Sequence, residues 1–530
     1  MGERDFDVAI VGAGFAGMYL LHRLRGLGLS ARVIEAGPGV GGTWYWNRYP
    51  GARCDVESLQ YSYQFDDALQ QEWDWSERYA TQAEILEYAE HVADRYDLRR
   101  DIEFESRVTS AHYDEAESLW TLEADDGGKT VARFCVMATG CLSVPNWPNI
   151  EGLESFAGPT YHTALWPDRK IDFTGKRVAV IGTGSSAIQA IPLIAREAAR
   201  LFVFQRTPNY TIPARNAPLD PDRVKDIKAN YGAMRARAKT SLVGIAGDYN
   251  LGSALEAAPE DRQAEYERRW LQGGVTFMGA YGDLMLEKDA NETAANFVRG
   301  KIREVVEDPA LAETLCPDNI IGGKRLCVDT DYFATYNRDN VTLIDVKGRP
   351  IEAITAGAVR AHGRDFEIDV LIIATGFDAM TGALNNIDIR GRGDACLRER
   401  WADGPSSYLG LAMADFPNLF TVTGPGSPSV FTNMIPSIEQ HVDWITDCLG
   451  YMKARNYTAI EAEGDAEKGW WDHVQEVAAQ GLKATTDSWY LGANVAGKPR
   501  VFMPYYGGFP AYCQKCEQVA ADGYEGFAFA

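Results

Sequence analysis

The chain begins with a strand-length apolar run that is followed at once by glycines. Residues 6–11 are apolar except at one position and predict a buried β-strand. Residues 12–17 carry three glycines in the spacing GxGxxG, and residues 18–28 predict a helix with leucines on one side. A second apolar run covers residues 31–35. Strand, glycine turn, helix and strand in this order predict a βαβ unit.

The same order returns in the middle of the chain. Residues 177–181 predict a strand, residues 182–187 carry the turn GxGxxA, residues 188–199 predict a helix and residues 201–204 a further strand. Two such units in one chain predict an α/β fold that contains two Rossmann-like dinucleotide-binding domains.

Between and after these units, the pattern separates helical from strand-like segments. Residues from about 215 to 320 are rich in Ala, Glu, Lys and Arg with helical periodicity, which predicts a helical insertion. The other predicted elements are strands at 119–123, 132–138, 341–344 and 366–373, helices at 221–239, 261–272, 438–449 and 466–478, and a polar aromatic loop at 487–506.

Composition narrows the functional classes. The net charge of −23 over 530 residues disfavours nucleic acid and anionic membrane surfaces as partners. No leader-like segment opens the chain, and no apolar run approaches the roughly 18 residues of a spanning helix, so a cytoplasmic protein is expected. The nine cysteines are scattered. Cys513 and Cys516 have CxxC spacing but no second ligand pair, so no metal site is expected.

The first glycine turn has the chemistry of a flavin or NAD site. Gly12, Gly14 and Gly17 let backbone N–H groups reach a pyrophosphate at a helix N-terminus. Glu35 ends the next strand, where a carboxylate accepts hydrogen bonds from a ribose diol and repels a 2′-phosphate. The site therefore favours FAD or NAD over NADP. The alternative is a glycine-rich turn without a ligand.

The second turn favours NADPH. Gly182, Gly184 and Ala187 repeat the motif, but the following strand ends in Gln205 and Arg206, without an acid. A guanidinium at this place can bind a 2′-phosphate. Lys324 and Arg325 could add positive charge, and the alternative for Arg206 is a solvated charge at a strand end. FAD and NADPH in one chain imply hydride transfer to a flavin.

Two Ala-Thr-Gly segments each follow a hydrophobic strand. They are residues 138–140 and 374–376 (Ala374, Thr375 and Gly376). We interpret them as the places where the chain crosses between the two dinucleotide domains, although ordinary strand-end glycines would give the same pattern.

Longer motifs carry a family resemblance. Phe156, Gly158, His162 and Trp166 stand in the pattern FxGxxxHxxxW, and residues 42–55 match GxWxxxxYPGxxxD. With both Rossmann turns and the segments 322–325, 374–378 and 487–489, the chain resembles the type I Baeyer–Villiger monooxygenases, closest to the phenylacetone and steroid monooxygenase branch. The resemblance spans nearly the whole sequence.

The resemblance implies a division of the chain. An FAD-binding domain comprises 1–141 and 375–530, an NADP-binding domain comprises 142–214 and 323–374, and the helical insertion comprises 215–322. It also implies NADPH- and O2-dependent oxidation of a small-molecule ketone to an ester or lactone through an FAD C4a-peroxyflavin, with sulfoxidation as a side activity. A monomer or weak dimer is expected.

Residue roles follow from the same resemblance. Arg325 matches the arginine beside the flavin, which favours the anionic oxidant and the developing oxyanion. Asp55 matches the acid that orients this arginine, and Lys324 a residue near the NADP phosphate. Trp489 matches a tryptophan whose indole N–H contacts the nicotinamide nucleotide. From residue type alone, a surface salt bridge is the preferred interpretation of Arg325, and Trp489 could equally be an aromatic anchor.

The remaining expected positions form three sets. Cofactor contacts are expected at Gly12, Gly14, Phe15, Gly17, Glu35, Gly42, Thr43, Trp44, Asp55, Tyr61, Val108, Met434, Gly182, Thr183, Gly184, Ser185, Ser186, Ala187, Gln189, Arg206, Thr207, Lys324, Arg325, Ala374, Thr375, Gly376 and Trp489. The substrate pocket is expected at Ser429, Val430 and Phe431, which could equally be core packing. A structural or hinge role is expected for Phe156, Gly158, His162 and Trp166.

Two other functional classes stay open. A heteroatom monooxygenase that oxidises amines or sulfides would use the same cofactors, although Trp166 and the Asp55–Arg325 pair argue against it as the main activity. A nucleotide-binding redox sensor without turnover would keep the folds but not the catalytic positions. A disulfide reductase is disfavoured because Cys54 has no CxxC partner near the first turn. The native ketone does not follow from the sequence.

Overall fold

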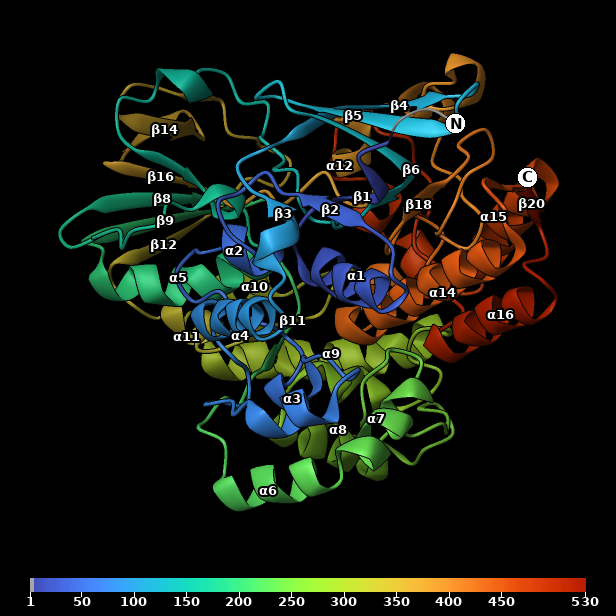
Figure 1. Ribbon diagram of the computed structural model, residues 1–530. Coiled ribbons are helices and arrows are strands. Elements are labelled where there is room, and N and C mark those ends of the chain that lie inside the picture. Colours follow the sequence, from blue (N-terminus) through green and yellow to red (C-terminus); the bar gives the residue numbers. More distant parts are fainter. Residues whose placement is uncertain (1–3) are drawn as a thin grey trace.

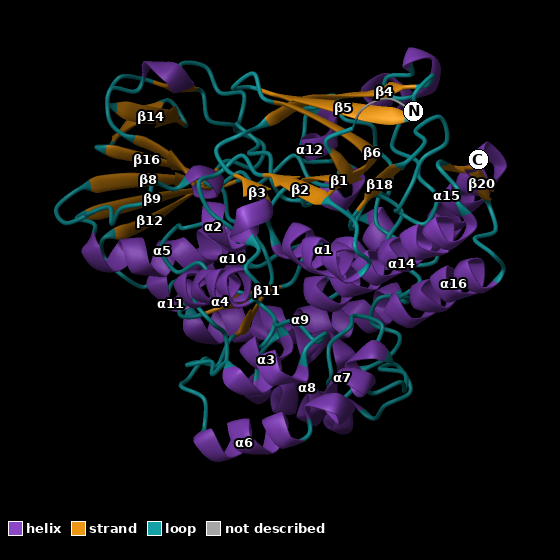
Figure 2. Cartoon of the chain, viewed as in Figure 1, coloured by secondary structure: helices purple, strands orange, loops and turns teal. Residues whose placement is uncertain are grey.

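A computed structural model describes residues 4–530. It contains two main β-sheets, which lie at the upper right and upper left of Figure 1, while α6 (Pro221–Ala229), α7 (Tyr231–Lys239) and α8 (Pro259–Gln272) lie at the lower end. Most helices gather on one side of the strands (Figure 2). The predicted α/β fold with parallel sheets is confirmed.

The first sheet has eight strands and joins the beginning of the chain to its last third. Its buried centre is parallel, because β1 pairs with β2 and β6, and β6 also pairs with β18. A β4–β5–β6 antiparallel meander extends one side. The strands are β1 (Phe6–Val11), β2 (Ala31–Ile34), β3 (Ile102–Glu103), β4 (Val108–Asp114), β5 (Leu119–Ala124), β6 (Lys129–Met137), β17 (Asp388–Arg390) and β18 (Leu419–Thr421).

The second sheet is parallel throughout and comes from the middle of the chain. Its strand order is β12–β9–β8–β16–β7. β8 and β16 are apolar and almost wholly buried, as expected for central strands that are covered on both faces. The strands are β7 (Thr160–His162), β8 (Arg177–Ile181), β9 (Arg200–Gln205), β12 (Val341–Asp345) and β16 (Val370–Ile373).

The chain crosses between the two sheets at the two Ala-Thr-Gly segments. After β6 of the first sheet, Gly140 leads to β7 of the second, and after β16 of the second sheet, Gly376 leads back to β17 of the first. The two crossings lie together, because the Asn146 N–H donates to the Gly376 carbonyl at 2.9 Å. The observed connections agree with our interpretation of these segments, while the exact domain boundaries stay a prediction.

Helices cover the sheets and form the insertion. Those next to the sheets or in the C-terminal part are α1 (Phe15–Gly26), α2 (Thr43–Trp46), α3 (Asp67–Glu72), α4 (Gln82–Arg95), α5 (Ser185–Glu197), α11 (Tyr332–Thr335), α12 (Gly382–Asn385), α13 (Leu397–Arg400), α14 (Met434–Arg455), α15 (Gly464–Ala479) and α16 (Phe509–Ala521). The insertion adds α9 (Lys288–Val305) and α10 (Pro309–Leu315). Small sheets are formed by β10 (Thr211–Pro213) with β11 (Cys327–Asp329), by β13 (Ala353–Ile354), β14 (Ala358–Ala361) and β15 (Arg364–Glu367), and by β19 (Ile460–Ala462) with β20 (Phe527–Phe529).

Four predicted elements need correction. Both dinucleotide helices begin earlier than predicted, at Phe15 and Ser185, because Gly14 and Gly184 are their N-caps. The predicted strand 366–373 is two strands, since β15 ends at Glu367 and Asp369 bonds to Arg177 before β16 begins at Val370. The predicted helix 221–239 is interrupted at Asn230, whose φ and ψ of −118° and 17° are not helical.

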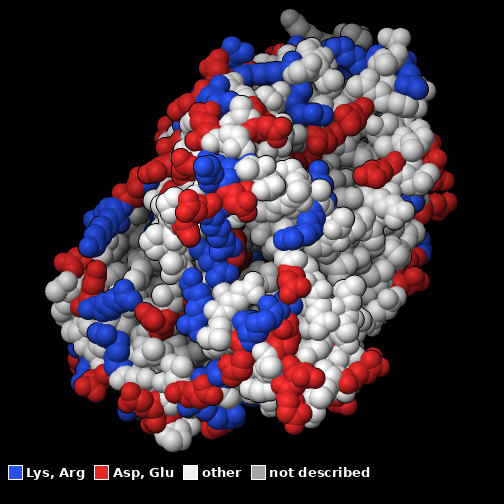
Figure 3. All heavy atoms as spheres, turned by 90° about the horizontal axis from the view of Figure 1, so that it is seen from below, with Lys and Arg blue, Asp and Glu red and all other residues white. Residues whose placement is uncertain are grey.

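Acidic and basic side chains are interspersed on the face seen from below (Figure 3). Within residues 4–530, no helix is long and apolar enough to cross a membrane.

Candidate functional site

Two positions of the first glycine turn can be occupied only by glycine. Gly12 has a φ of 105°, and a Cβ there would lie 2.7 Å from the Ala138 carbonyl oxygen. A Cβ on Gly17 would overlap the Gly12 carbonyl oxygen. The turn therefore packs directly on the first crossing and leads into the 12-residue helix α1, whose N-terminus favours an anion.

Glu35 lies at this turn, as the sequence predicts. Its side chain is buried, and its carboxylate accepts hydrogen bonds from the Ala13 N–H at 2.7 Å and the Gly37 N–H at 2.8 Å. Burial raises the pKa of Glu35, and these backbone donors oppose the rise. The carboxylate is therefore held beside the turn at the place where a ribose hydroxyl would bind.

Aromatic residues of the predicted cofactor set pack next to the same turn. The Trp44 indole N–H donates to the Tyr61 hydroxyl at 3.0 Å, and Phe15 packs against Tyr61 with ring centroids 6.1 Å apart. Gly42, with a φ of 53°, approaches Gly14 so closely that a Cβ would lie 2.9 Å from its Cα. The structure thus brings together the predicted residues of α1, α2 and the loop before Tyr61.

The other predicted residues of the first set are more peripheral. Thr43 opens α2, and its carbonyl accepts from Asn47. Val108 is the buried first residue of β4. Met434 is the half-buried first residue of α14 and packs against the hydrophobic core. Their contacts with a cofactor stay predictions.

The second glycine turn repeats the geometry of the first. Gly182 has a φ of 112°, and a Cβ there would lie 2.5 Å from the carbonyl oxygen of Ala374 in the second crossing. A Cβ on Gly184 would meet nothing within 4 Å, so the start of α5 is open. The Thr183 hydroxyl donates to the Thr207 carbonyl at 2.9 Å, which fastens the turn to the segment after β9. Around this turn, Ser185 contacts Cys327, Ser186 is half-buried and Ala187 is buried.

Two cations lie near this turn. Arg206 is exposed directly after β9, and Lys324 is half-buried. The pKa of Lys324 is lowered by burial and then by the charge of Arg206, so the two cations are close. Within residues 4–530, neither forms an ion pair with a carboxylate at 4 Å or less. A dianionic phosphate would neutralise both.

Arg325 and Asp55 form the ion pair that the sequence predicts. The Arg325 Nε and Nη2 atoms donate to the two Asp55 carboxylate oxygens at 2.7 and 2.8 Å, and Nη1 donates to the Val430 carbonyl at 3.0 Å. The side chains are 33% and 17% exposed, respectively. The Asp55 charge raises the pKa of Arg325 further above its usual value. This is a bidentate, partly buried pair and not a surface salt bridge.

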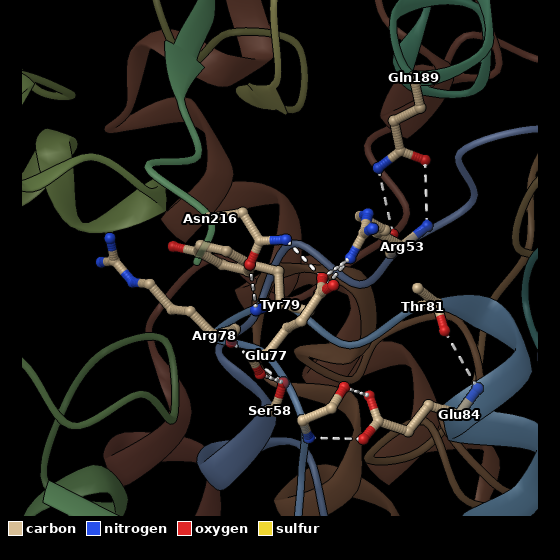
Figure 4. Close-up of polar contacts among 10 residues, drawn as sticks. Arg53, Ser58, Glu77, Arg78, Tyr79, Thr81, Glu84, Gln189 and Asn216 are labelled. Carbon is tan, nitrogen blue, oxygen red and sulfur yellow. Dashed lines mark hydrogen bonds and ion pairs between the residues drawn. The ribbon is translucent and has the colours of Figure 1, made fainter. Parts of the chain in front are cut away.

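The loop that carries Asp55 is fastened to helix α5 of the second sheet. The Gln189 amide oxygen accepts from the Tyr49 hydroxyl at 2.8 Å. The same oxygen accepts from the Arg53 N–H at 3.4 Å, and the Gln189 NH2 group donates to the Arg53 carbonyl at 3.1 Å (Figure 4). Gly51 has a φ of 79°, and a Cβ there would lie 2.6 Å from the Gln189 carbonyl oxygen. The Gln189 side chain therefore holds this loop, and its cofactor contact stays a prediction.

The start of the insertion joins the same network. The Asn216 amide donates to Glu77 at 2.7 Å and accepts from the Tyr79 N–H at 2.9 Å, while Arg53 pairs with Glu77 (Figure 4). These contacts connect the start of the insertion to Arg53, so a movement of the insertion would shift the loop that carries Asp55.

The predicted substrate loop lies against the ion pair. Ser429 and Val430 are buried, and Val430 contributes the carbonyl that Arg325 contacts. Phe431 packs against Tyr490, Phe502 and Tyr506, with ring centroids at 4.5, 5.7 and 5.7 Å. These rings form an apolar wall next to Arg325. We call these four residues the aromatic wall.

Trp489 adjoins this wall. Its ring centroid is 4.1 Å from that of Tyr490, and the loop is held by the Asn494 amide, which donates to the Phe377 carbonyl at 2.7 Å. The predicted cofactor loop is thus joined to the second crossing, whose residues Thr375 and Gly376 bond to the first crossing through Asn146.

His162 lies at the end of β7 and is not poised as a base. Its Nδ1 accepts from the Ala164 N–H at 3.1 Å, and burial lowers the pKa of the ring. Trp166 packs between Tyr161 and Phe173, with ring centroids at 5.3 and 6.4 Å. Gly158 approaches the Asp369 carbonyl beside the Phe156 ring. These contacts support a structural role for the motif.

One prominent residue was missed from the sequence. Lys483 lies in the segment 482–485, and its ammonium group donates to the Gly322 carbonyl. It also lies 5.2 Å from the ring centroid of Phe431 and 5.5 Å from that of Tyr490. Its surroundings, Gly-Leu-Lys-Ala-Thr, give no sign of this position.

Potential metal ligands and cysteines are dispersed among residues 4–530. Residues 4–530 contain no group of three or more His, Cys, Asp or Glu arranged to hold a metal ion. All nine cysteines are free thiols, including Cys513 and Cys516 on α16.

Comparisons with known proteins find relatives over nearly the whole chain. Residues 9–250 match the family model described as pyridine nucleotide-disulphide oxidoreductase. The chain is 41% identical to the Baeyer-Villiger monooxygenase of Pseudooceanicola batsensis over 98% of this chain and 95% of that protein. An oxidised steroid monooxygenase bound to NADP is 51% identical, with a TM-score of 0.95 and 99% of each chain covered. The OTEMO complex with FAD and NADP has a TM-score of 0.97 at 38% identity over 100% of both chains.

Proposed function

The chain belongs to the Baeyer–Villiger monooxygenase family, and we propose that it oxidises ketones to esters or lactones with FAD, NADPH and O2. The observation that carries the proposal is the bidentate Arg325–Asp55 pair beside an apolar wall, close to two glycine turns that fit dinucleotides.

The residues present fit both cofactors. The turn at Gly12 and the buried carboxylate of Glu35 would hold FAD, because the helix start favours the pyrophosphate and the acid favours a free ribose. The open start of α5 at Gly184 would hold the NADPH pyrophosphate, with Arg206 and Lys324 at its 2′-phosphate. FAD that is reduced by NADPH activates O2 and supplies the oxygen atom that the ketone receives.

Arg325 would stabilise the negative charge that develops on the ketone oxygen during the reaction. A guanidinium has five N–H donors, and three of them are used by Asp55 and Val430. Two donors are therefore free for the reacting oxygen. Asp55 fixes the plane of the guanidinium, so little reorganisation is needed when the charge appears.

The aromatic wall would bind the hydrocarbon part of the ketone and keep water away. Phe431, Tyr490 and Phe502 are packed together and present few polar atoms. A dry site strengthens the interaction of Arg325 with the developing charge and protects the reactive oxygen from protons.

The test is oxidation of a ketone panel by the purified FAD-loaded protein. Aryl, cyclic and steroidal ketones and one thioether are incubated with NADPH in air, and the products are identified by mass and retention time. Ketone products that contain one extra oxygen and have ester retention are expected. Oxidation of the thioether alone would contradict the proposal and favour a heteroatom monooxygenase. NADPH consumption that yields only hydrogen peroxide across the panel would favour an oxidase.

A further inference from the structure

Lys483 lies on the wall of the proposed ketone site. It comes from the segment before the Trp489 loop, and its ammonium group donates to the carbonyl of Gly322, three residues before Arg325. The same group lies over the rings of Phe431 and Tyr490, which are next to Val430 and Trp489 in the sequence. The amine is therefore inside the group of residues already assigned to substrate and cofactor.

The segment that carries Lys483 is packed closely in this position. The Leu482 N–H donates to the Met285 carbonyl at 2.9 Å, and a Cβ on Gly323 would overlap the Thr486 hydroxyl. Gly322 has a φ of 77°, and a Cβ there would lie 2.9 Å from the Met285 sulfur. Backbone contacts on both sides thus fix where the lysine side chain starts.

The charge of this lysine has no protein counter-ion. Among residues 4–530, no carboxylate lies within 4 Å of its amine, and the nearby Asp55 is bound bidentately to Arg325. Burial, and then the positive charge of Arg325, lower the pKa of Lys483 to about 7. Burial and the neighbouring charge of Arg325 thus disfavour the charged form of the Lys483 amine until an anion binds.

The hydrogen-bond donors of the Lys483 ammonium group also favour an anionic ligand. An ammonium group has three N–H donors, and one is used by Gly322. The rings of Phe431 and Tyr490 attract the positive charge but accept no strong hydrogen bond. Two donors are left for a ligand that carries a charged acceptor.

We propose that Lys483 is a specificity-determining residue that binds the carboxylate of the substrate, so that the enzyme prefers keto acids to neutral ketones of the same size. The proposal rests on the proposed function, which places the reacting carbonyl at Arg325. A keto acid would be held at two points, its carbonyl at Arg325 and its carboxylate at Lys483, with the hydrocarbon between them on the aromatic wall.

The test compares two ketones that differ by one carboxylate, 4-phenylbutan-2-one and 4-(3-oxobutyl)benzoate. The variant Lys483→Met keeps the length and apolar packing of the side chain, and Lys483→Arg keeps the charge. Lys468→Met is the control, because Lys468 is exposed and pairs with Asp472 on α15. Ester formation gives kcat and KM for each ketone. Melting curves show whether each variant is folded.

We expect the unmodified enzyme to favour the keto acid. Lys483→Met should lower kcat/KM for the acid by about 10- to 100-fold, mainly through KM, because a hydrogen bond between two charged groups is lost. The kcat/KM of Lys483→Met for the neutral ketone should differ from that of the unmodified enzyme by no more than about threefold. Lys483→Arg should retain most of the preference and Lys468→Met all of it.

Two results would overturn the proposal. Equal kcat/KM for both ketones in the unmodified enzyme would show that no carboxylate is recognised. An equal loss for both ketones in Lys483→Met would show that the lysine supports the fold or the reaction instead.

Binding of both ketones to the oxidised FAD-loaded enzyme, measured by calorimetry without NADPH, separates this proposal from the proposed function. Tighter binding of the acid that depends on Lys483, without ester from either ketone, would reject the function and keep the anion site. Ester formation without tighter binding of the acid would support the proposed function and reject the anion site at Lys483.

Discussion

Replacement of Arg325 by alanine tests the assigned chemistry most sharply at a single residue. The change removes three hydrogen bonds, two to Asp55 at 2.7 and 2.8 Å and one to the Val430 carbonyl at 3.0 Å. It leaves the Asp55 carboxylate without its cation in a place where its side chain is only 17% exposed.

The expected loss of stability is modest. Breaking a fully buried ion pair costs about 3–5 kcal/mol. Because the Arg325 side chain is 33% exposed, water can reach the vacated space and solvate Asp55, so we expect about 1–2 kcal/mol. The second change Asp55→Asn removes the unpaired charge and should restore part of this loss.

The expected loss of activity is much larger. Removal of one preorganised group that stabilises developing charge lowers turnover by about 10²- to 10³-fold, or about 3–4 kcal/mol of barrier. Reduction of FAD by NADPH does not need this charge, so its rate should be nearly unchanged. NADPH consumption should therefore continue in air and yield hydrogen peroxide instead of ester.

Two assays distinguish these effects. Anaerobic mixing with NADPH follows flavin reduction by absorbance, and product analysis in air follows ester formation. Arg325→Ala should be reduced normally and form almost no ester, and the double variant should be more stable but equally inactive. Normal ester formation by Arg325→Ala would refute the role of the guanidinium. Recovery of ester formation in the double variant would refute the reasoning on charge.

Three further predictions concern other parts of the chain. Arg206→Gln should raise KM for NADPH by about tenfold or more and leave KM for NADH unchanged in steady-state assays, because a 2′-phosphate contact is lost; equal effects on both nucleotides would contradict the assignment. Gln189→Leu removes the hydrogen bonds to Tyr49 and Arg53, so the ratio of hydrogen peroxide to ester should rise, and an unchanged ratio would argue against a positioning role. Burial raises the pKa of Glu439 to about 7. Its protonated form is therefore favoured in the folded state, and this stabilisation is lost as the pH rises from about 4.5 to 7. Glu439→Gln should stabilise the protein by up to about 2–3 kcal/mol at pH 8 and little at pH 5 in urea unfolding, and equal stabilities at pH 8 would exclude the raised pKa.

The sequence predicts the two nucleotide units well because their constraints are local. A glycine at position 12 or 182 is needed by the turn itself, where the φ angle is positive and a neighbouring carbonyl is in contact. Both helix starts are predicted too late, because residues 15–17 and 185–187 are counted as part of the glycine turns, whereas Gly14 and Gly184 are the N-caps of the helices.

The division of residues 366–373 into two strands depends on pairing with distant segments, which the local apolar pattern does not show. Residues 366–373 look like one alternating strand, but the segment leaves a hairpin at Glu367 and enters a parallel sheet at Val370. Asp369 marks the change by bonding to Arg177, which is distant in the sequence. Such a contact is not visible in a local period of two.

The same distinction holds for the site. Arg325 and Asp55 were found because they stand in recognisable motifs, although they are far apart in the sequence. Lys483 was missed because its importance comes only from what packs around it, namely Gly322, Phe431 and Tyr490. A lysine after Gly-Leu in a polar segment is typical of an exposed surface.

The most direct test of the central claim is the fate of oxygen from O2. The FAD-loaded protein is incubated with NADPH, an aryl ketone that it accepts, and oxygen gas labelled with ¹⁸O, and the product is analysed by mass spectrometry. We predict an ester with one ¹⁸O atom, located between the carbonyl carbon and the migrated group. An unlabelled ester, or label found only in hydrogen peroxide, would contradict the assignment of this chain as an enzyme that inserts oxygen next to a ketone carbonyl.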